Sequence, residues 1–111
     1  MTGRSRKYLS DILIAVGLIE EFISDISNFM DYQNDNKTKS AVERQLVIIG
    51  EAVSHFRKES GSNLNSSHQI INFRNRLVHA YDVIDDAIVW VIIQKHLPEL
   101  KMEVEEIIKK P

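Results

Sequence analysis

The sequence predicts an all-α protein, an antiparallel bundle of four to five helices, on two observations. Apolar residues recur at three- and four-residue steps along most of the 111 residues, and this spacing places them on one side of a helix. The chain holds only two prolines and four glycines, which favours a few long helices over many short strands. Because short loops join neighbouring helices, the order is antiparallel. We expect one domain spanning residues 1–111.

The first helix is predicted from an apolar stripe that starts close to the N-terminus. The stripe consists of Tyr8, Leu9, Ile12, Leu13, Val16, Ile19, Ile23, Ile26 and Met30. Thr2 and Ser5 are the two candidates for its N-cap. The polar segment "DYQNDNKTKS", residues 31–40, is rich in turn-forming residues and is expected to be a loop.

A second helix follows this predicted loop. Its core-facing residues are Val42, Leu46, Ile49, Val53 and Phe56. Ser40, with Glu43 three residues later, fits a capping box at its start. Gly50 lies in the middle, where glycine costs about 1 kcal/mol relative to alanine. We therefore expect another backbone to approach this helix closely at Gly50.

Two further helices are predicted after the polar loop "ESGSNLNSS". A short one runs from about Ser67 to Leu77, and the last begins after Asp85 as N-cap. The apolar stripe of the last helix is Ile88, Val91, Ile92, Leu97, Leu100, Val104 and Ile107. Pro98 is expected to bend or interrupt it, because proline donates no hydrogen bond and its ring displaces the residue four back.

Several apolar residues lie away from these stripes. They are Leu18, Phe22, Val47, Ile48, Val89 and Trp90. A helix that is apolar on more than one side is buried on more than one side. In so small a chain, we expect the second side to pack against another copy, which predicts a homodimer.

Composition narrows the classes of function. The chain has no cysteine, which excludes a disulfide framework, a thiolate metal site and a cysteine nucleophile. The histidines show no zinc-ligand spacing, so we expect no metal and no cofactor. No apolar run approaches the roughly 20 residues that span a bilayer, and the basic N-terminus leads into an amphipathic pattern. These features predict a cytoplasmic protein without a membrane partner.

Charge is unevenly distributed along the chain. The formal net charge is −2, yet residues 55–81 carry four cations, Arg57, Lys58, Arg74 and Arg76, against Glu59 alone. This indicates a modest basic patch on an otherwise acidic molecule, although such a patch is often only solvated surface.

The segment "FRNRLVHAYDVID", residues 73–85, concentrates more polar side chains than the end of a helix requires. Five residues of helix turn through about 140°, so Arg74 and His79 would not share a face of a continuous helix. If the helix frays near Val78, His79 and Tyr81 point to one side by two-residue alternation. Asn75, four residues before His79, can then hold its imidazole by a hydrogen bond.

The polar segment has a chemical and a structural interpretation. Histidine exchanges protons near neutral pH, and arginine stabilises charge that develops on phosphate oxygens, so His79 and Arg74 suit cleavage of a phosphodiester. The RNA 2′-hydroxyl then serves as an internal nucleophile, Arg76 is a candidate phosphate contact and Tyr81 can stack on a base. Alternatively, arginine and histidine merely complement the helix dipole near a C-terminus. Spacing alone does not decide between the two.

A family resemblance bears on that choice. The blocks "RKYLSDIL", "AVERQLVIIGEAV", "IINFRNRLVHAYDVID" and "VWVIIQKHLPELKMEVEEI" together resemble the HEPN superfamily (higher eukaryotes and prokaryotes nucleotide-binding). More narrowly, they resemble the HepT-like toxins of prokaryotic toxin–antitoxin pairs, in the right order and over nearly the whole chain. The family motif, arginine–four residues–histidine–any–tyrosine, is matched by Arg74, His79 and Tyr81, and its polar second residue by Asn75. The proline–tryptophan pair frequent in relatives before the third helix is absent from "NLNSSHQII".

The resemblance implies an all-α homodimer whose two motifs face each other across a cleft. It implies a metal-independent endoribonuclease of a type VII-like system, acting on RNA such as tRNA or mRNA, with Arg74 and His79 as catalytic residues. Asn75 is expected to be the orienting residue, and Arg76 and Tyr81 are the candidate substrate contacts.

The implied partner is a minimal nucleotidyltransferase antitoxin that silences the toxin by AMPylation of Tyr81. The alternative from another class is a non-catalytic nucleotide- or substrate-binding partner of that nucleotidyltransferase. Glu51 matches a family position and is a candidate to orient Arg74 or Arg76, with an ordinary surface ion pair as its other interpretation.

Overall fold

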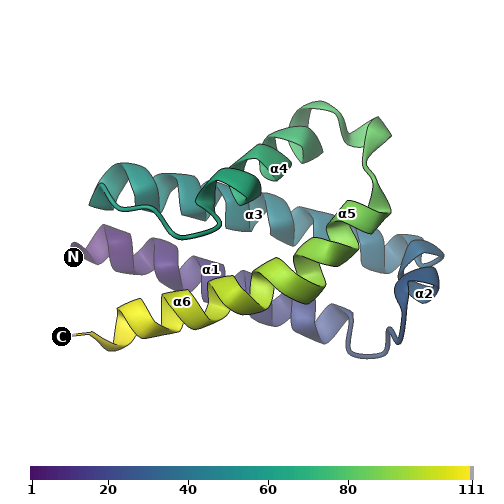
Figure 1. Ribbon diagram of the computed structural model, residues 1–111, viewed down its shortest axis with the longest axis horizontal. Helices are drawn as coiled ribbons and strands as arrows, with labels where there is room; N and C mark the ends of the chain where they lie inside the picture. Colours follow the sequence, from purple (N-terminus) through teal and green to yellow (C-terminus); the bar gives the residue numbers. More distant parts are fainter. Residues whose placement is uncertain (111) are drawn as a thin grey trace.

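The chain folds as an all-helical bundle in a computed structural model that describes residues 1–110, except the side chain of Tyr81. The long helices are α1 (Gly3–Phe22), α3 (Asn36–Ser60) and α4 (Ser67–His79), followed by a final arm of α5 (Asp86–Val91), η2 (Ile92–His96) and α6 (Leu97–Lys109). Successive long segments run in opposite directions, and both ends of the chain lie at the same end of the bundle (Figure 1). The described residues contain no strand, which confirms the predicted fold class.

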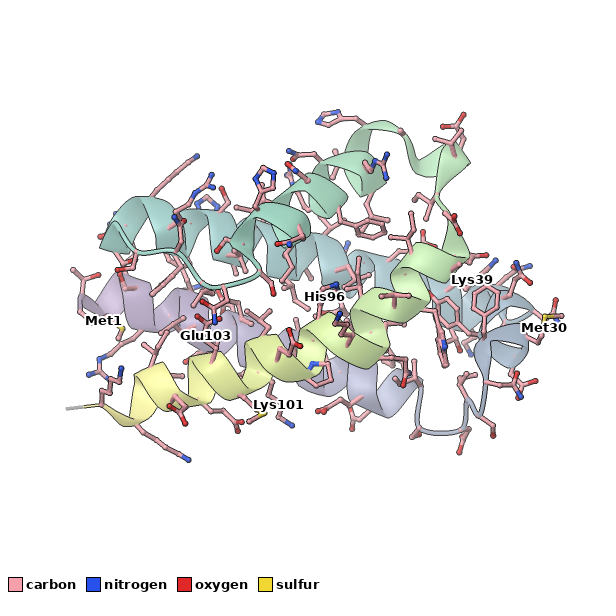
Figure 2. The ribbon with its side chains drawn as sticks, viewed as in Figure 1. Met1, Met30, Lys39, His96, Lys101 and Glu103 are labelled. Atoms are coloured by element: carbon pink, nitrogen blue, oxygen red, sulfur yellow. The ribbon has the colours of Figure 1, made fainter. Side chains whose placement is uncertain are left out.

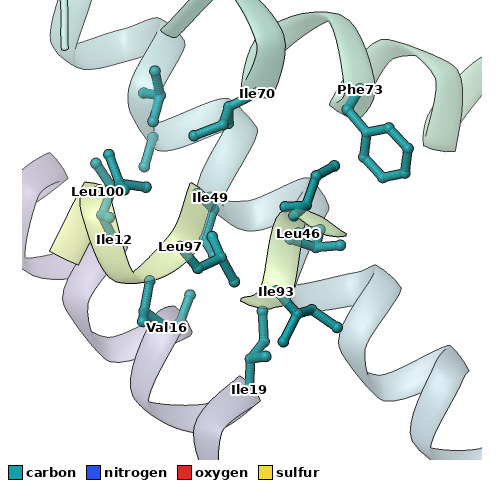
Figure 3. Close-up of a cluster of buried hydrophobic side chains, with 14 of the residues drawn as sticks. Ile12, Val16, Ile19, Leu46, Ile49, Ile70, Phe73, Ile93, Leu97 and Leu100 are labelled. Carbon is teal, nitrogen blue, oxygen red and sulfur yellow. The ribbon is translucent and has the colours of Figure 1, made fainter. Parts of the chain in front are cut away.

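The core lies where the four segments meet. α3 packs against both α1 and α4, and α6 packs against α1. The side chains at the centre include Ile12, Val16, Ile19, Leu46, Ile49, Ile70, Phe73, Ile93, Leu97 and Leu100 (Figure 3). Burial of apolar surface is the main favourable term in folding. These contacts therefore fix the position of α4, which carries the polar residues of the segment 73–85 as far as His79.

The connection between α1 and α3 differs from the prediction. α1 ends at Phe22, and the five-residue helix α2 (Phe29–Gln33) occupies part of the predicted loop. Asn28 caps α2 by accepting a hydrogen bond from the backbone N–H of Asp31 at 2.9 Å. The buried ring of Tyr32 packs 5.4 Å from that of Trp90. This aromatic contact between distant segments holds α2 in place. The local sequence pattern therefore does not predict α2.

The start of α3 corrects a second prediction. Asp35 is the N-cap, and its carboxylate accepts hydrogen bonds from the backbone N–H of Thr38 at 3.0 Å and the Thr38 hydroxyl at 2.7 Å. These hydrogen bonds lower the pKa of Asp35. Ser40 therefore lies inside α3, and the predicted capping box of Ser40 and Glu43 is wrong. At α1, Thr2 is the N-cap, because its hydroxyl accepts from the N–H of Ser5 at 3.0 Å.

The final arm begins and changes register near the predicted places. Asp85 is the N-cap of α5 and accepts from the backbone N–H of Ala87 at 2.8 Å. Pro98 has no N–H for the carbonyl of Gln94, and the preceding segment η2 is a turn of π-helix in which the N–H of Leu97 reaches the carbonyl of Ile92. The arm continues past Pro98, but its hydrogen-bond register is interrupted.

The surface apolar residues are not those that suggested a partner. Val89 is fully buried, and Trp90 is half-buried against α2, so neither requires a second copy. The exposed apolar side chains near the end of α4 and along α5 are Val78, Val83, Ile88 and Val91. Within residues 1–110, no helix combines the length and apolar character needed to cross a bilayer.

A polar contact joins α3 to the start of α5. Lys39 forms an ion pair with Asp86 at 3.0 Å (Figure 2). Glu43, one turn further along α3, is half-buried, and burial raises the pKa of its carboxyl, with the charge of Asp86 adding to the effect and that of Lys39 opposing it. Folding therefore favours the protonated form of Glu43.

We expect Glu43→Gln to stabilise the protein at neutral pH. Because the folded state binds the Glu43 proton more tightly than the unfolded state, the stability of the wild type falls as pH rises above the ordinary glutamate value of 4.5. Below that value the carboxyl is protonated in both states, and the difference between variant and wild type should disappear. Urea unfolding across this pH range measures it, with the exposed Glu105→Gln as control; an equal effect at all pH values would contradict the prediction.

Candidate active site on α4

The polar residues at the end of α4 form the candidate site, and Arg74, Asn75, Arg76, His79 and Tyr81 are called the motif cluster below. α4 remains helical through His79, because the N–H of Ala80 donates to the carbonyl of Arg76 at 2.8 Å and closes the last turn. The helix therefore does not fray near Val78, which was the condition for His79 and Tyr81 to point to one side. The backbone then enters the 3-10 turn η1 (Tyr81–Val83), and the Tyr81 side chain lies outside the described part of the chain.

Arg74 is held by two hydrogen bonds. Its Nη2 donates to Oε1 of Glu51 on α3 at 3.0 Å, and its Nη1 donates to Oδ1 of Asn75 at 3.1 Å. Of the two arginines considered for Glu51, Arg74 is thus the one it contacts. The side chains of Arg74 and Glu51 are 27% and 47% exposed, so this ion pair contributes only about 0–1 kcal/mol to stability. Its main effect is to fix the direction of the guanidinium.

Gly50 explains how Arg74 approaches α3 so closely. A Cβ on Gly50 would lie 2.6 Å from Cγ of Arg74 and closer still to its Cβ, with the backbone oxygen of Ile70 at 3.5 Å. The close approach predicted at Gly50 is confirmed, although the first two side-chain carbons of Arg74 make the tightest contact. A side chain at position 50 would push α4 away, so this glycine sets the distance between Arg74 and Glu51.

His79 points to a different side of α4. It is exposed in the last turn, about 140° around the helix from Arg74. Asn75 lies between them, next to Arg74 in sequence and one turn before His79. One chain therefore brings together Arg74, Asn75 and Glu51 but leaves His79 apart, at a helix C-terminus where a cationic imidazole is favourable.

A small hollow of about 180 Å³ adjoins Arg74. Besides Glu51 and Asn75, it is lined by Ser54, His55 and Lys58 of α3. These three residues were not among the predicted site residues, but their spacing of three, four and seven from Glu51 places them on the same face of α3. Lys58 adds a second cation beside Arg74, which accounts for part of the predicted basic patch.

Arg76, His55 and His68 each have surroundings of their own. Arg76 is exposed and faces a groove between α4 and α5, not the hollow of Arg74. His55 stacks on Tyr8 with ring centroids 5.2 Å apart, and His68 contacts Asn72 at 3.1 Å. In the described part of the chain, no three histidine, aspartate or glutamate side chains gather as metal ligands.

Comparison with known proteins places this arrangement in a family. Residues 12–107 match the family described as "Ribonuclease HepT-like". A protein of Thermococcus cleftensis named "Probable ribonuclease HepT" is 37% identical over 96% of this chain and 98% of its own length. A protein of Caldanaerobacter subterraneus, named as a "Putative RNase", is 36% identical over 95% of each chain. A third, from Methanocaldococcus jannaschii and named in the same way, is 35% identical over 94% of this chain and 87% of its own. No solved structure matches the chain.

We expect Gly50→Ala to destabilise the protein by about 1–3 kcal/mol, because the added methyl group meets carbons of Arg74 that cannot move without moving α4. Thermal and urea unfolding measure this change. Gly17→Ala on α1 is the matched control: a Cβ there meets nothing within 4 Å, so helix propensity alone should raise stability by about 0.5–1 kcal/mol. A stabilising effect at both positions would show that α3 and α4 are not in close contact.

Proposed function

This chain belongs to the ribonuclease HepT-like family, and on that premise we propose that it is a metal-independent endoribonuclease acting through Arg74 and His79. The observation that supports this most directly is the anchored guanidinium. Arg74 is held by Glu51 and Asn75 at a position that is still partly exposed, five residues before an exposed histidine on the same helix. A side chain needed only for folding gains little from such an arrangement.

Arg74 is suited to bind the phosphate that is cut. A guanidinium has five N–H donors, and only two of those of Arg74 are used by Glu51 and Asn75. Nη1 and Nη2 each retain one hydrogen for the non-bridging oxygens of a phosphate. Because the group is already oriented, it needs little reorganisation as negative charge develops on those oxygens in the transition state.

His79 supplies the proton transfers in the proposed reaction. Its imidazole takes the proton from an RNA 2′-hydroxyl, and the 2′-oxygen forms a bond to the adjacent phosphorus. The bond from phosphorus to the 5′-oxygen breaks, and that oxygen receives a proton from a protonated histidine or from water. The products are a 2′,3′-cyclic phosphate and a free 5′-hydroxyl, and neither a metal nor a protein nucleophile takes part.

A second copy of the chain completes the proposed site. Arg74 and His79 face different sides of one α4, so a single chain does not present both to one phosphate. Val78 and Val83 lie on either side of His79 in the sequence and are 41% and 74% exposed. Such exposed apolar groups suit self-association. We propose a homodimer in which the two motif clusters face each other across a shared cleft.

Regulation is proposed to act on Tyr81. The backbone of Tyr81 starts the turn η1, two residues after His79. The proposed partner is a minimal nucleotidyltransferase antitoxin that transfers AMP from ATP to the Tyr81 hydroxyl and releases pyrophosphate. The new phosphodiester adds negative charge to a residue two positions from His79 in the sequence, where it would repel the phosphates of RNA and silence the toxin.

One observation favours a second candidate function. Because Arg74 and His79 do not converge within one chain, the same cations can hold a nucleotide or RNA without cutting it. The chain would then be a binding partner of the nucleotidyltransferase instead of its target enzyme. Turnover of labelled RNA, as opposed to retention of it, separates the two functions.

We expect His79→Ala to reduce RNA cleavage by about 10²–10⁴-fold through loss of the proton transfers, and Arg74→Ala by about 10²–10³-fold through loss of charge stabilisation. Initial rates on end-labelled RNA measure both, and circular dichroism and mass by light scattering check the fold and the assembly. Arg44→Ala, an exposed cation elsewhere on α3, is the control and should cleave as wild type. Equal rates in all four proteins would mean that the activity belongs to a contaminant.

We expect the protein to gain mass in whole units of AMP when it is produced together with the proposed nucleotidyltransferase partner. Intact-mass spectrometry measures this gain, which Tyr81→Phe should abolish because it removes the acceptor hydroxyl. Tyr8→Phe is the matched control and should retain the gain. Modification that persists in Tyr81→Phe would assign the acceptor to another residue.

A further inference from the structure

A wide groove of the described structure lies outside the hollow of Arg74. α4 and the final arm diverge from each other toward the η1 end (Figure 1), and a groove of about 810 Å³ lies between them. Its volume falls in the range of roughly 300–1,000 Å³ typical of small-ligand sites. We call it the α4–α5 groove.

The fold explains why the groove is open. At the start of α4, Glu103 of α6 accepts hydrogen bonds from the backbone N–H of Asn65 at 3.0 and 3.1 Å, and this ties α4 to the final arm (Figure 2). At its other end α4 packs on α3, while α5 turns toward α2. The π-helical turn η2 contributes Ile92 and His96 to the groove, and such turns occur frequently at functional sites.

The two sides of the groove differ in chemistry. The floor and the α5 side are apolar and include Phe73, Val91 and Ile92. The α4 side carries hydrogen-bonding groups, among them His68, Asn72 and Arg76. The contact of His68 with Asn72 at 3.1 Å orders this side. The groove therefore suits a ligand that has a flat apolar ring with polar edges and an anionic group beside the ring.

We propose that the α4–α5 groove binds one base of a single-stranded RNA, with the flanking phosphate on Arg76. This inference rests on the proposed function, because it takes RNA as the ligand, and it adds a base-recognition site to the motif cluster. The apolar floor packs against the face of the base, and the side chains of α4 meet its edge.

Charge favours RNA over a protein segment in this groove. The residues that line it include Arg76 and two histidines but no aspartate or glutamate, although the chain as a whole carries a net charge of −2. Arg76 also lines an adjoining hollow together with Asp85, which does not line the groove itself. Among the described side chains, no carboxylate lies within ion-pair distance of Arg76. The groove therefore presents positive charge that the molecule leaves available to an anion.

The groove also continues into the motif cluster. Asn72, Arg76 and His79 are spaced by four and three residues, so they form one exposed stripe along α4. Arg76 and His79 are separated by a rise of about 4.5 Å along the helix. A strand whose base lies in the groove therefore passes its backbone from Arg76 toward His79. Recognition of that base would set a sequence preference next to the bond that is cut.

The first experiment fills the groove while Arg74 and Arg76 stay in place. Ala87 is an exposed residue of α5 that lines the groove, and Ala87→Leu places extra side-chain volume there. Binding of short fluorescent RNAs with different bases is measured by anisotropy in a His79→Ala background, so that cleavage does not interfere. Ala87→Leu should weaken binding about tenfold, which corresponds to loss of one stacked base. Ser10→Leu, an equally exposed addition on α1, is the matched control and should bind as the parent.

A second pair of variants and a mass measurement complete the test. Arg76→Ala should weaken binding and its dependence on salt, whereas Arg44→Ala should not. RNA affinity unchanged by Ala87→Leu, or no measurable RNA binding by the parent, overturns the proposal. A fall in the mass of the assembly with RNA affinity intact also overturns it, because the groove then seats a second copy.

The failure of this proposal is distinguishable from failure of the nuclease. Cleavage that depends on His79 but is unchanged by Ala87→Leu would support the proposed nuclease activity and refute base binding in the groove. If the wild-type protein does not cut RNA, but Ala87→Leu weakens RNA binding, the proposed nuclease activity is refuted and base binding in the groove is supported.

Discussion

The contact between α3 and α4 at Gly50 determines the geometry of everything on α4. With no side chain at this position, the Cβ and Cγ of Arg74 lie directly on the backbone of α3, and the guanidinium reaches Glu51 one residue further along. The arginine is then oriented by a carboxylate whose own position is fixed by a long, well-packed helix. A glycine that weakens α3 by about 1 kcal/mol locally is thus what allows α4 to lie close enough for this pairing.

The arrangement of the bundle explains why α4 depends on its contact with α3. α3 packs on α1 along one side, and its other side is available to α4. α4 has only thirteen residues, and it is tied to the final arm near its start and packed on α3 beyond that. Toward the far end of α4, Arg74 rests on α3 at Gly50. That end holds His79 and leads into the turn η1, so His79 stands clear of the core and is exposed to solvent.

How far the sequence predicts this structure depends on the range of each interaction. The apolar stripes, the caps at Thr2 and Asp85 and the effect of Pro98 are local features, and the structure agrees with them. α2 was missed because Tyr32 is held by Trp90, nearly sixty residues away. The cap at Ser40 was misplaced because Asp35 offers two hydrogen bonds to Thr38 earlier in the chain. For the site, Gly50 pointed to a close approach, but only the structure identifies Arg74 as the side chain that makes it.

The same comparison bears on how a complete site would arise. Sequence spacing alone already separates Arg74 from His79 by about 140° on a continuous helix, and α4 is continuous through His79. A chemistry that needs both groups at one phosphate therefore requires either a distortion of α4 or a second chain. The last turn of α4 is closed by a short hydrogen bond from Ala80 to Arg76, which opposes distortion. The proposed assembly of two copies avoids that distortion. In the proposed dimer, formation of the contact between subunits and formation of the active site are then the same event, and AMP on Tyr81 would act at their common boundary.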